Sequence, residues 1–246
     1  MGFGLTLLLS VPHNEVGLPD TILIGVQAMF RRSLTILFCL GAIAIAGCQP
    51  NAIPRSPSAG ASKESQIQLA DLDTETALLV TGAMEQIGKT TTYDPAYVGL
   101  AYPNGDVPIE RGVCTDVVVR ALRNTGVDLQ VLIHEDMTQA FHAYPNLWDL
   151  SRPDPNIDHR RVPNINTFLR RQGKDLPITS QPADYRPGDI VAWRLPSGLL
   201  HIGLVSNIHA RGSQRLKVIH NIGSGTRLED ILFRFEIIGH FRYFPS

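Results

Sequence analysis

The sequence predicts an α+β fold for the folded part of the chain, with helices in the front half and an antiparallel sheet in the back half. Two observations predict this class. Apolar residues recur at helical spacing between residues 71 and 172, and from Pro187 onward they alternate with a period of two. The connections between the expected strands are short, which favours an antiparallel meander over a parallel, doubly wound sheet.

The composition excludes several broad classes of protein. The 246 residues are 43% hydrophobic and 18% charged, and 22 Lys and Arg against 23 Asp and Glu give a net charge of -1. Such a chain is neither intrinsically disordered nor a strongly basic nucleic-acid binder. The sequence has no GxGxxG, phosphate loop or CxxC pair, so nucleotide and structural-zinc sites lack their usual signals. We therefore expect no cofactor and no nucleic-acid partner.

The first 66 residues are expected to lie outside the folded domain. Arg31 and Arg32 precede an uncharged apolar run over residues 34–46, which has the length of a signal peptide and is short for a membrane span. The sequence IAGC at residues 45–48 resembles the lipobox of bacterial lipoprotein signal peptides. That resemblance implies cleavage before Cys48 and lipidation of its thiol. A transmembrane anchor is the alternative.

Residues 1–28 lack a basic region, whereas Met29 begins a better signal, so the chain start is expected to be over-extended. The residues after Cys48 are rich in Ser, Ala and Pro and are typical of a flexible tether. The sorting rule of Gram-negative lipoproteins, with Gln49 in place of Asp, implies the periplasmic side of the outer membrane. The expected segments are an over-extended start (1–28), a signal peptide (29–47), a lipidated cysteine with its tether (48–66) and the folded domain (67–246).

Three helices are expected in the front half, over residues 71–87, 114–125 and 163–172. Each is followed by a glycine suited to a helix end, at positions 88, 126 and 173. In the second helix, Thr115 and Asp116 fit the first turn. Its three consecutive valines disfavour an isolated helix, so this helix should be buried.

Four strands are expected in the back half, over residues 190–195, 199–206, 216–221 and 235–244. The turn sequence RPGD at residues 186–189 begins the first strand. The sequence PSG at residues 196–198 turns the first strand into the second.

The chemistry of the domain depends on Cys114, because Cys39 and Cys48 both lie in the apolar N-terminal stretch. A lone cysteine in an exported protein is either a buried small hydrophobe or a reactive thiol. At a helix start, backbone N–H groups and the helix dipole favour the thiolate and lower the pKa of the cysteine. Asp116, two residues later, would raise that pKa.

Two of the eight histidines, His201 and His220, lie on consecutive expected strands. A simple hairpin centred on residues 209–212 places them directly opposite each other on one face, with Cβ atoms about 5 Å apart. A register slip of one residue would place Asn221 there instead of His220. A structural role for each histidine is the alternative.

These motifs resemble a known family. The helix-start cysteine resembles that of the NlpC-like branch of papain-type cysteine peptidases, whose members cut peptides of the bacterial cell wall. The sheet carries further shared motifs: RPGDIV at 186–191, HIGLV at 201–205 and VIH at 218–220. The chain more specifically resembles an uncharacterised bacterial family allied to this branch. Three motifs carry this resemblance: YPNGDVP at 102–108, GVCTDV at 112–117 and NIDHRRVP at 156–163. The similarity covers about residues 75–245 and implies a papain-like fold. The broad family usually has DCSG where this chain has VCTD at 113–116.

The resemblance implies a role for each matching residue. Cys114 would attack an amide carbonyl, His201 would act as general base and then protonate the leaving amine, and His220 would orient the His201 ring. The backbone N–H of Cys114 would stabilise the oxyanion. Tyr102 matches in position a tyrosine that lines the substrate pocket, although a tyrosine packed under a Pro-Gly loop is an equal alternative.

Three further side chains are candidates for substrate binding. Asp116 either favours the helix N-terminus or binds the free amine of a cell-wall stem peptide. Asp158 and His159, in the sequence DHRR, either line the cleft or form a salt-bridged structural turn.

Three functions compete at this point. The first is a cysteine amidase or endopeptidase acting on peptidoglycan stem peptides, held at the membrane by the lipid on Cys48. The second is an inactive relative that binds cell-wall peptides and regulates another hydrolase. The third is a zinc protein that uses Cys114, His201 and His220 as ligands.

Overall fold

The computed structural model describes residues 64–245. The expected start segment, signal peptide and lipidated Cys48 lie outside the described residues. Within residues 64–245, no helix has both the length and the apolar character needed to cross a membrane.

The described part of the chain contains four α-helices: α1 (Thr74–Met84), α2 (Cys114–Arg123), α3 (Leu129–Ala140) and α4 (Val162–Arg171). Four 3-10 turns accompany them: η1 (Leu69–Asp71), η2 (Phe141–Ala143), η3 (Asp158–Arg160) and η4 (Pro182–Asp184). Helices α1, α2 and α4 fall where helices were predicted. Helix α3 was not predicted. It begins where Asp128 accepts a hydrogen bond from the Gln130 N–H, and it buries Leu129, Ile133 and Met137.

Seven strands are present: β1 (Thr92–Tyr93), β2 (Arg111–Gly112), β3 (Ile190–Arg194), β4 (Leu200–His209), β5 (Leu216–Asn221), β6 (Thr226–Glu229) and β7 (Glu236–Phe241). Strands β1 and β2 form a small parallel pair, and the other five form an antiparallel sheet in the order β6-β5-β4-β3-β7. The predicted α+β class, with helices in front and an antiparallel sheet behind, is confirmed.

The last strand corrects the predicted topology. A pure meander would place β7 beside the preceding strand, but β7 returns to the opposite edge and pairs with β3, with Ile190 opposite Phe241. Asp189 holds this edge together. Its buried carboxylate accepts hydrogen bonds from the Arg186 N–H at 2.8 Å and from Arg242 Nε at 2.7 Å, and it lies 2.8 Å from His240 Nε2. The aspartate of the PGD turn therefore ties β7 to the start of β3.

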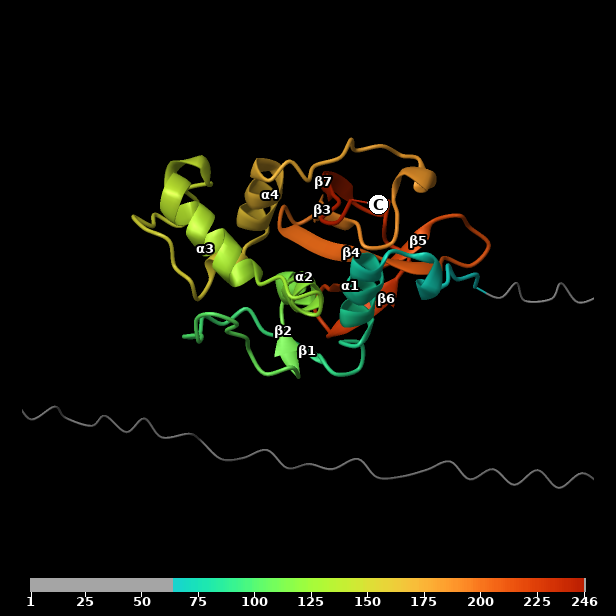
Figure 1. The fold of residues 1–246 in the computed structure, drawn as a ribbon, viewed down its shortest axis with the longest axis horizontal. Coiled ribbons are helices and arrows are strands. Elements are labelled where there is room, and N and C mark those ends of the chain that lie inside the picture. The colour runs from blue at the N-terminus through green and yellow to red at the C-terminus, as the bar shows by residue number, and fades with distance from the viewer. Residues whose placement is uncertain (1–63, 246) are drawn as a thin grey trace, which may run out of the picture. The chain divides into compact units, whose positions relative to one another are not determined.

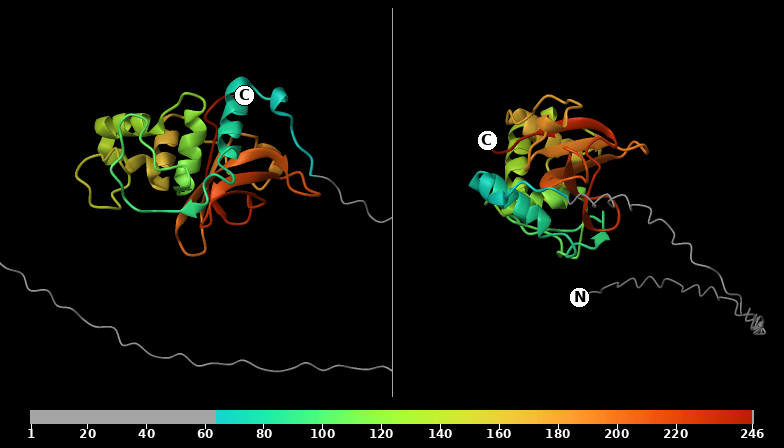
Figure 2. Two further views of the ribbon diagram at one scale, coloured as in Figure 1. Left: turned by 90° about the horizontal axis from the view of Figure 1, so that it is seen from below. Right: turned by 90° about the vertical axis from the view of Figure 1, so that its right-hand side faces the viewer.

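The helices gather beside one face of the sheet (Figures 1 and 2). Alternation along β4 divides the interior into two apolar clusters. Ile202 and Leu204 pack with Cys114 and the helices, whereas Val205 packs on the other face with Trp193. The candidate site residues on β4 and α2 are therefore divided between the two faces of the sheet.

Candidate active site

Cys114 is the first residue of α2, and only 4% of its surface is exposed. The backbone N–H groups of Ile202 and of Thr115 act on its Sγ in the direction that favours a thiolate, and the Tyr93 hydroxyl interacts with the same sulfur. The residue also lines a cleft of about 350 Å³. The thiol is thus held at a helix N-terminus, against β4, at the bottom of an open cleft.

Burial decides the protonation of this thiol. Removal from water raises the pKa of Cys114 to about 11, and the neighbouring Asp116 adds to the rise. The N–H groups at the helix start and of Ile202 act in the opposite direction and are outweighed. The expected lowering of this pKa by the helix N-terminus is therefore wrong for the resting protein.

Asp116 and Arg160 clamp the start of α2. The Asp116 carboxylate accepts the Val113 N–H at 2.7 Å, as a helix cap, and binds Arg160 through two contacts of 2.9 and 3.0 Å. The Thr115 hydroxyl donates to the Arg160 carbonyl oxygen at 3.0 Å. The side chain of Asp116 is 4% exposed and that of Arg160 is 2% exposed. Asp116 therefore positions the cysteine, and its carboxylate is already engaged.

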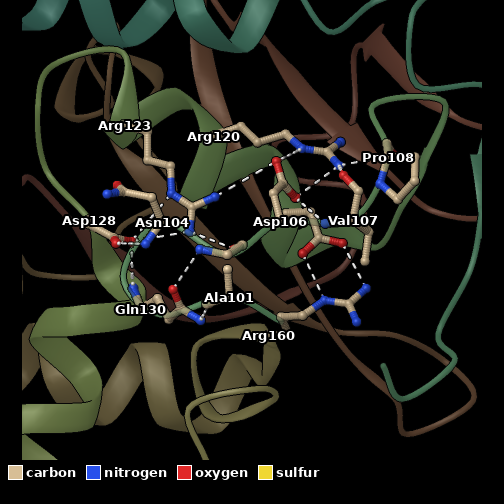
Figure 3. A network of polar contacts seen from close by, with 12 residues as sticks. Ala101, Asn104, Asp106, Val107, Pro108, Arg120, Arg123, Asp128, Gln130 and Arg160 are labelled. Carbon is tan, nitrogen blue, oxygen red and sulfur yellow. Dashed lines mark hydrogen bonds and ion pairs between the residues drawn. The ribbon is translucent and has the colours of Figure 1, made fainter. Parts of the chain in front are cut away.

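Two arginines on α2, Arg120 and Arg123, hold in place the loop that precedes this helix (Figure 3). Arg120 binds the Asp106 carboxylate at 2.9 Å and the Arg111 carbonyl oxygen at 3.0 Å. Arg123 bridges the Gly105 carbonyl oxygen and Asp128, at 2.8 and 3.1 Å. This network joins the YPNGDVP segment to the cysteine helix.

His201 and His220 are neighbours, with 3.1 Å between His201 Nε2 and His220 Nδ1. The predicted register is wrong by two residues, since Leu204 pairs with Ile219 and His220 is therefore diagonal to His201. A bulge between Val205 and His209 and a longer turn cause the shift. An even shift keeps both rings on one face, so the predicted contact survives.

Gly203 makes room for this contact. A Cβ atom at this position would lie 2.7 Å from Val218 Cγ1 and 3.0 Å from His220 Cβ. The glycine of the HIG motif is therefore required by the close approach of β5 and of the second histidine.

Glu229 on β6 extends the pair into a chain of three groups. Its Oε2 lies 3.0 Å from His220 Nε2, although the two atoms are not aligned as a linear hydrogen bond. The pKa values of both histidines are lowered, chiefly by burial, and that of His201 falls to about 3. Sequence reasoning missed Glu229, because β6 was not predicted and nothing local marks its carboxylate.

Cys114 and His201 lie toward opposite faces of the sheet. Ile202 packs with Cys114, while the His201 ring stacks on Trp193 with 5.8 Å between centroids. No hydrogen bond joins the thiol to His201 within residues 64–245. The Asn221 side chain donates to the Gly112 carbonyl oxygen at 3.0 Å, which fixes the cysteine loop to the end of β5.

The other predicted site residues lie apart from the thiol. Tyr102 is 45% exposed, packs edge-on against His134 at 5.3 Å between centroids, and is not one of the described residues that line the cysteine cleft. Asp158 and His159 are buried in η3, where Asp158 binds Arg161 at 3.1 Å. Of the two expected roles, this arrangement matches the salt-bridged structural turn.

Tyr93, and not the predicted Tyr102, is the tyrosine that lines the cysteine cleft among the described residues. Burial raises its pKa to about 12, so it remains a hydroxyl donor. Trp148 forms another wall of the cleft. The sequence carries no signal for either residue, because Tyr93 lies on the two-residue strand β1 and Trp148 on an irregular segment, and only the tertiary fold brings them to α2.

A shared metal centre finds no support in the geometry. Nowhere in residues 64–245 do three or more His, Cys, Asp or Glu side chains converge as a ligand set.

Comparison with known proteins defines the family of this chain. Residues 80–243 match the family described as a domain of unknown function, DUF1287. The protein belongs to the DUF1287 family. The matched range includes the cysteine, both histidines and Glu229. A relative of this DUF1287 protein, "Uncharacterized protein YijF" from Escherichia coli (strain K12), is 60% identical over 163 residues, which are 66% of this chain and 79% of that protein.

A solved structure also shows a limited likeness to this DUF1287 protein. NlpC1 from Trichomonas vaginalis is 14% identical, with a TM-score of 0.36 over 68% of this chain. The chain spans 45% of the length of NlpC1.

Proposed function

We propose that this protein is a cysteine hydrolase of the cell envelope that cleaves amide bonds in the stem peptides of peptidoglycan. The observation that carries the proposal is the thiol of Cys114, held at a helix N-terminus in a cleft, beside the strand whose His201 contacts His220. The resemblance of the surrounding motifs to NlpC-like peptidases supports the choice of substrate.

The resting site holds a thiol and a neutral imidazole, because the pKa of Cys114 is raised and that of His201 is lowered. His201 Nε2 faces His220, so Nδ1 is the nitrogen that remains to act as the base. In the proposed first step, Sγ bonds to the amide carbon while its proton passes to His201 Nδ1. This step requires the His201 ring to approach Sγ when substrate binds.

The intermediate collapses as the C–N bond breaks and His201 returns its proton to the leaving amine. A thioester with Cys114 remains. Water then attacks the thioester carbon and gives a proton to His201. The C–S bond breaks, His201 returns the proton to Sγ, and a carboxylic acid and the free thiol are released. The Cys114 N–H is the proposed donor to the oxyanion.

We also propose that the protein is exported and anchored by a lipid on Cys48, on the periplasmic side of the outer membrane. This placement would bring the domain to its proposed substrate, the cell wall. Cells fed a radiolabelled fatty acid should label the wild-type protein and leave Cys48→Ala unlabelled. Label retained by Cys48→Ala would contradict lipidation at this residue.

Digestion of purified peptidoglycan tests the proposed activity. The full-length protein and its Cys114→Ala variant are incubated with peptidoglycan in reducing buffer, and released fragments are identified by mass spectrometry. Fragments from the wild type alone would support a cysteine hydrolase and identify the bond. An absence of fragments from a protein shown to be folded would overturn the proposal.

One observation favours a second candidate, a non-catalytic protein that binds cell-wall peptides. The thiol and His201 share no hydrogen bond in the described structure, and both rest in their uncharged forms. Cosedimentation of the full-length protein with peptidoglycan, without release of fragments, would support this candidate.

A further inference from the structure

The cleft above Cys114 is lined mainly by apolar side chains. Four of the exposed large hydrophobic side chains line it: Tyr93, Leu147, Trp148 and Leu199. Leu147 is 63% exposed and Leu199 is 68% exposed, so both rise at its rim. Leu199 lies beside the β3–β4 turn, whereas Leu147 and Trp148 come from the segment between α3 and η3.

The positive charges that line this cleft are paired with buried carboxylates. Its only charged lining residues among those described are Arg160 and Arg161. Arg160 is bonded to the buried carboxylate of Asp116, and Arg161 binds Asp158 at 3.1 Å with its guanidinium 3.9 Å from the Trp148 ring centroid. None of the described lining residues is acidic, so the cleft offers no counterion to an ammonium group.

We infer that this cleft binds the acyl side of the substrate and that the group bound there is uncharged and apolar. The inference rests on the proposed function. A thioester on Cys114 retains the acyl part of the amide, so that part must occupy the space next to Sγ through both steps. An ionised carboxylate or ammonium entering an apolar cleft without a partner loses hydration that nothing replaces.

This inference selects among the bonds of a stem peptide. The scissile carbonyl should belong to a neutral residue such as alanine, or to the neutral group that joins the peptide to the sugar. Bonds whose acyl side carries an ionised carboxylate or ammonium, as glutamate and diaminopimelate do, should be poor substrates. In the digestion described above, new carboxyl termini should fall on neutral residues. A new carboxyl terminus on glutamate or diaminopimelate would overturn the inference while leaving hydrolysis established.

Thiol labelling tests the cleft without requiring hydrolysis. The full-length protein is treated with maleimides that carry a neutral benzyl, a carboxyethyl or an aminoethyl substituent, and labelling of Cys114 is followed by peptide mass spectrometry. Each rate is divided by the rate with N-acetylcysteine, which corrects for intrinsic reactivity. We expect the benzyl reagent to exceed both charged reagents by at least about tenfold. Equal normalised rates would overturn the inference.

A matched pair of variants locates the effect. Leu199→Lys should reduce the preference for benzyl over carboxyethyl several-fold, because it adds a cation at the rim. Ile178→Lys adds the same charge at a 51% exposed apolar position outside the cleft and should leave the ratio unchanged. An equal change in both variants would show a general charge effect and would contradict the assigned cleft. A benzyl preference in a protein that releases no peptidoglycan fragments would overturn the proposed function alone.

Discussion

At the scale of single residues, the reactivity of Cys114 reflects a competition between burial and the helix N-terminus. The N–H donors to Sγ stabilise a thiolate, yet the loss of water around a sulfur that is 4% exposed has the larger effect. A preformed thiolate–imidazolium pair is therefore not expected in the resting protein.

This competition predicts the pH dependence of alkylation at Cys114. With a pKa of about 11, the thiolate fraction rises about tenfold per pH unit below that value. We expect the rate of labelling by iodoacetamide, followed by peptide mass spectrometry, to rise steadily from pH 7 to pH 10. A plateau between pH 5 and pH 8 would reveal an ion pair and contradict the prediction.

Glu229 is expected to set the tautomers of both histidines. A carboxylate oxygen 3.0 Å from His220 Nε2 favours a proton on that nitrogen, which leaves Nδ1 as an acceptor for the His201 Nε2–H. His201 Nδ1 is then the free base. Loss of Glu229 would allow the opposite tautomer, with a proton on the nitrogen that should receive one.

Glu229→Ala should lower kcat by about tenfold or more, with little change in KM. Glu229→Gln should retain most activity, because its amide oxygen can still accept a hydrogen bond from the His220 Nε2–H. Nitrogen NMR shifts of the two imidazoles should change in the alanine variant only. Glu236→Ala serves as the matched control. It removes an exposed glutamate on β7 that is paired with Arg194 on β3. Equal activity of the two alanine variants would rule out a role for Glu229.

At the scale of elements, the sequence predicted the residue ranges of three strands better than it predicted which strands pair and in which register. The range of β5 was predicted correctly, and β3 and β4 were predicted nearly so, because period two and the PGD turn are local signals. The register of β4 with β5 depends on a bulge that has no local signal. The return of β7 to β3 depends on long-range bonds to Asp189.

The clamp between η3 and α2 leads to a prediction about stability. Removing one partner of a buried ion pair leaves the other charge without compensation, so Arg160→Met should lower the free energy of unfolding by about 3–5 kcal/mol. The double variant Asp116→Asn with Arg160→Met should recover part of that loss. Urea denaturation measures both changes.

An exposed pair provides the control. Arg215 and Asp230 lie 2.7 Å apart with about 40% of each side chain exposed, so Arg215→Met should cost less than about 1 kcal/mol. Equal losses for Arg160→Met and Arg215→Met would show that the clamp does not hold the cysteine helix.

At the scale of the whole molecule, the site combines residues that the sequence marks with residues that it does not. Cys114, His201 and His220 stand out because unusual residue types occupy regular elements. Tyr93, Trp148 and Glu229 lie on irregular or short segments that carry no local motif, and only the tertiary fold brings them to the site. The assignment of Tyr102 relied on position in a motif, but its ring packs against His134.

The buried titratable groups together predict how the stability of the protein depends on pH. The folded pKa of His201 is about 3 and that of His159 about 4, against an ordinary value of 6.5. The unfolded chain therefore binds protons first as the pH falls below 6.5, and stability is lost. His159 alone accounts for about 3 kcal/mol at pH 4. The folded pKa of Cys114 lies above its ordinary 9.0, so the unfolded chain also gains an advantage above pH 9.

Thermal unfolding measured by circular dichroism from pH 4 to pH 10.5 should show a maximum Tm between about pH 7 and pH 9. His159→Gln should flatten the acid side of the curve, because it removes a group that the unfolded state protonates. His142→Gln, at an exposed position, should leave the slope unchanged. A Tm at pH 4.5 equal to that at pH 7.5 would show that these histidines accept protons in the folded protein. The neutral imidazole assigned to His201 at rest would then be wrong.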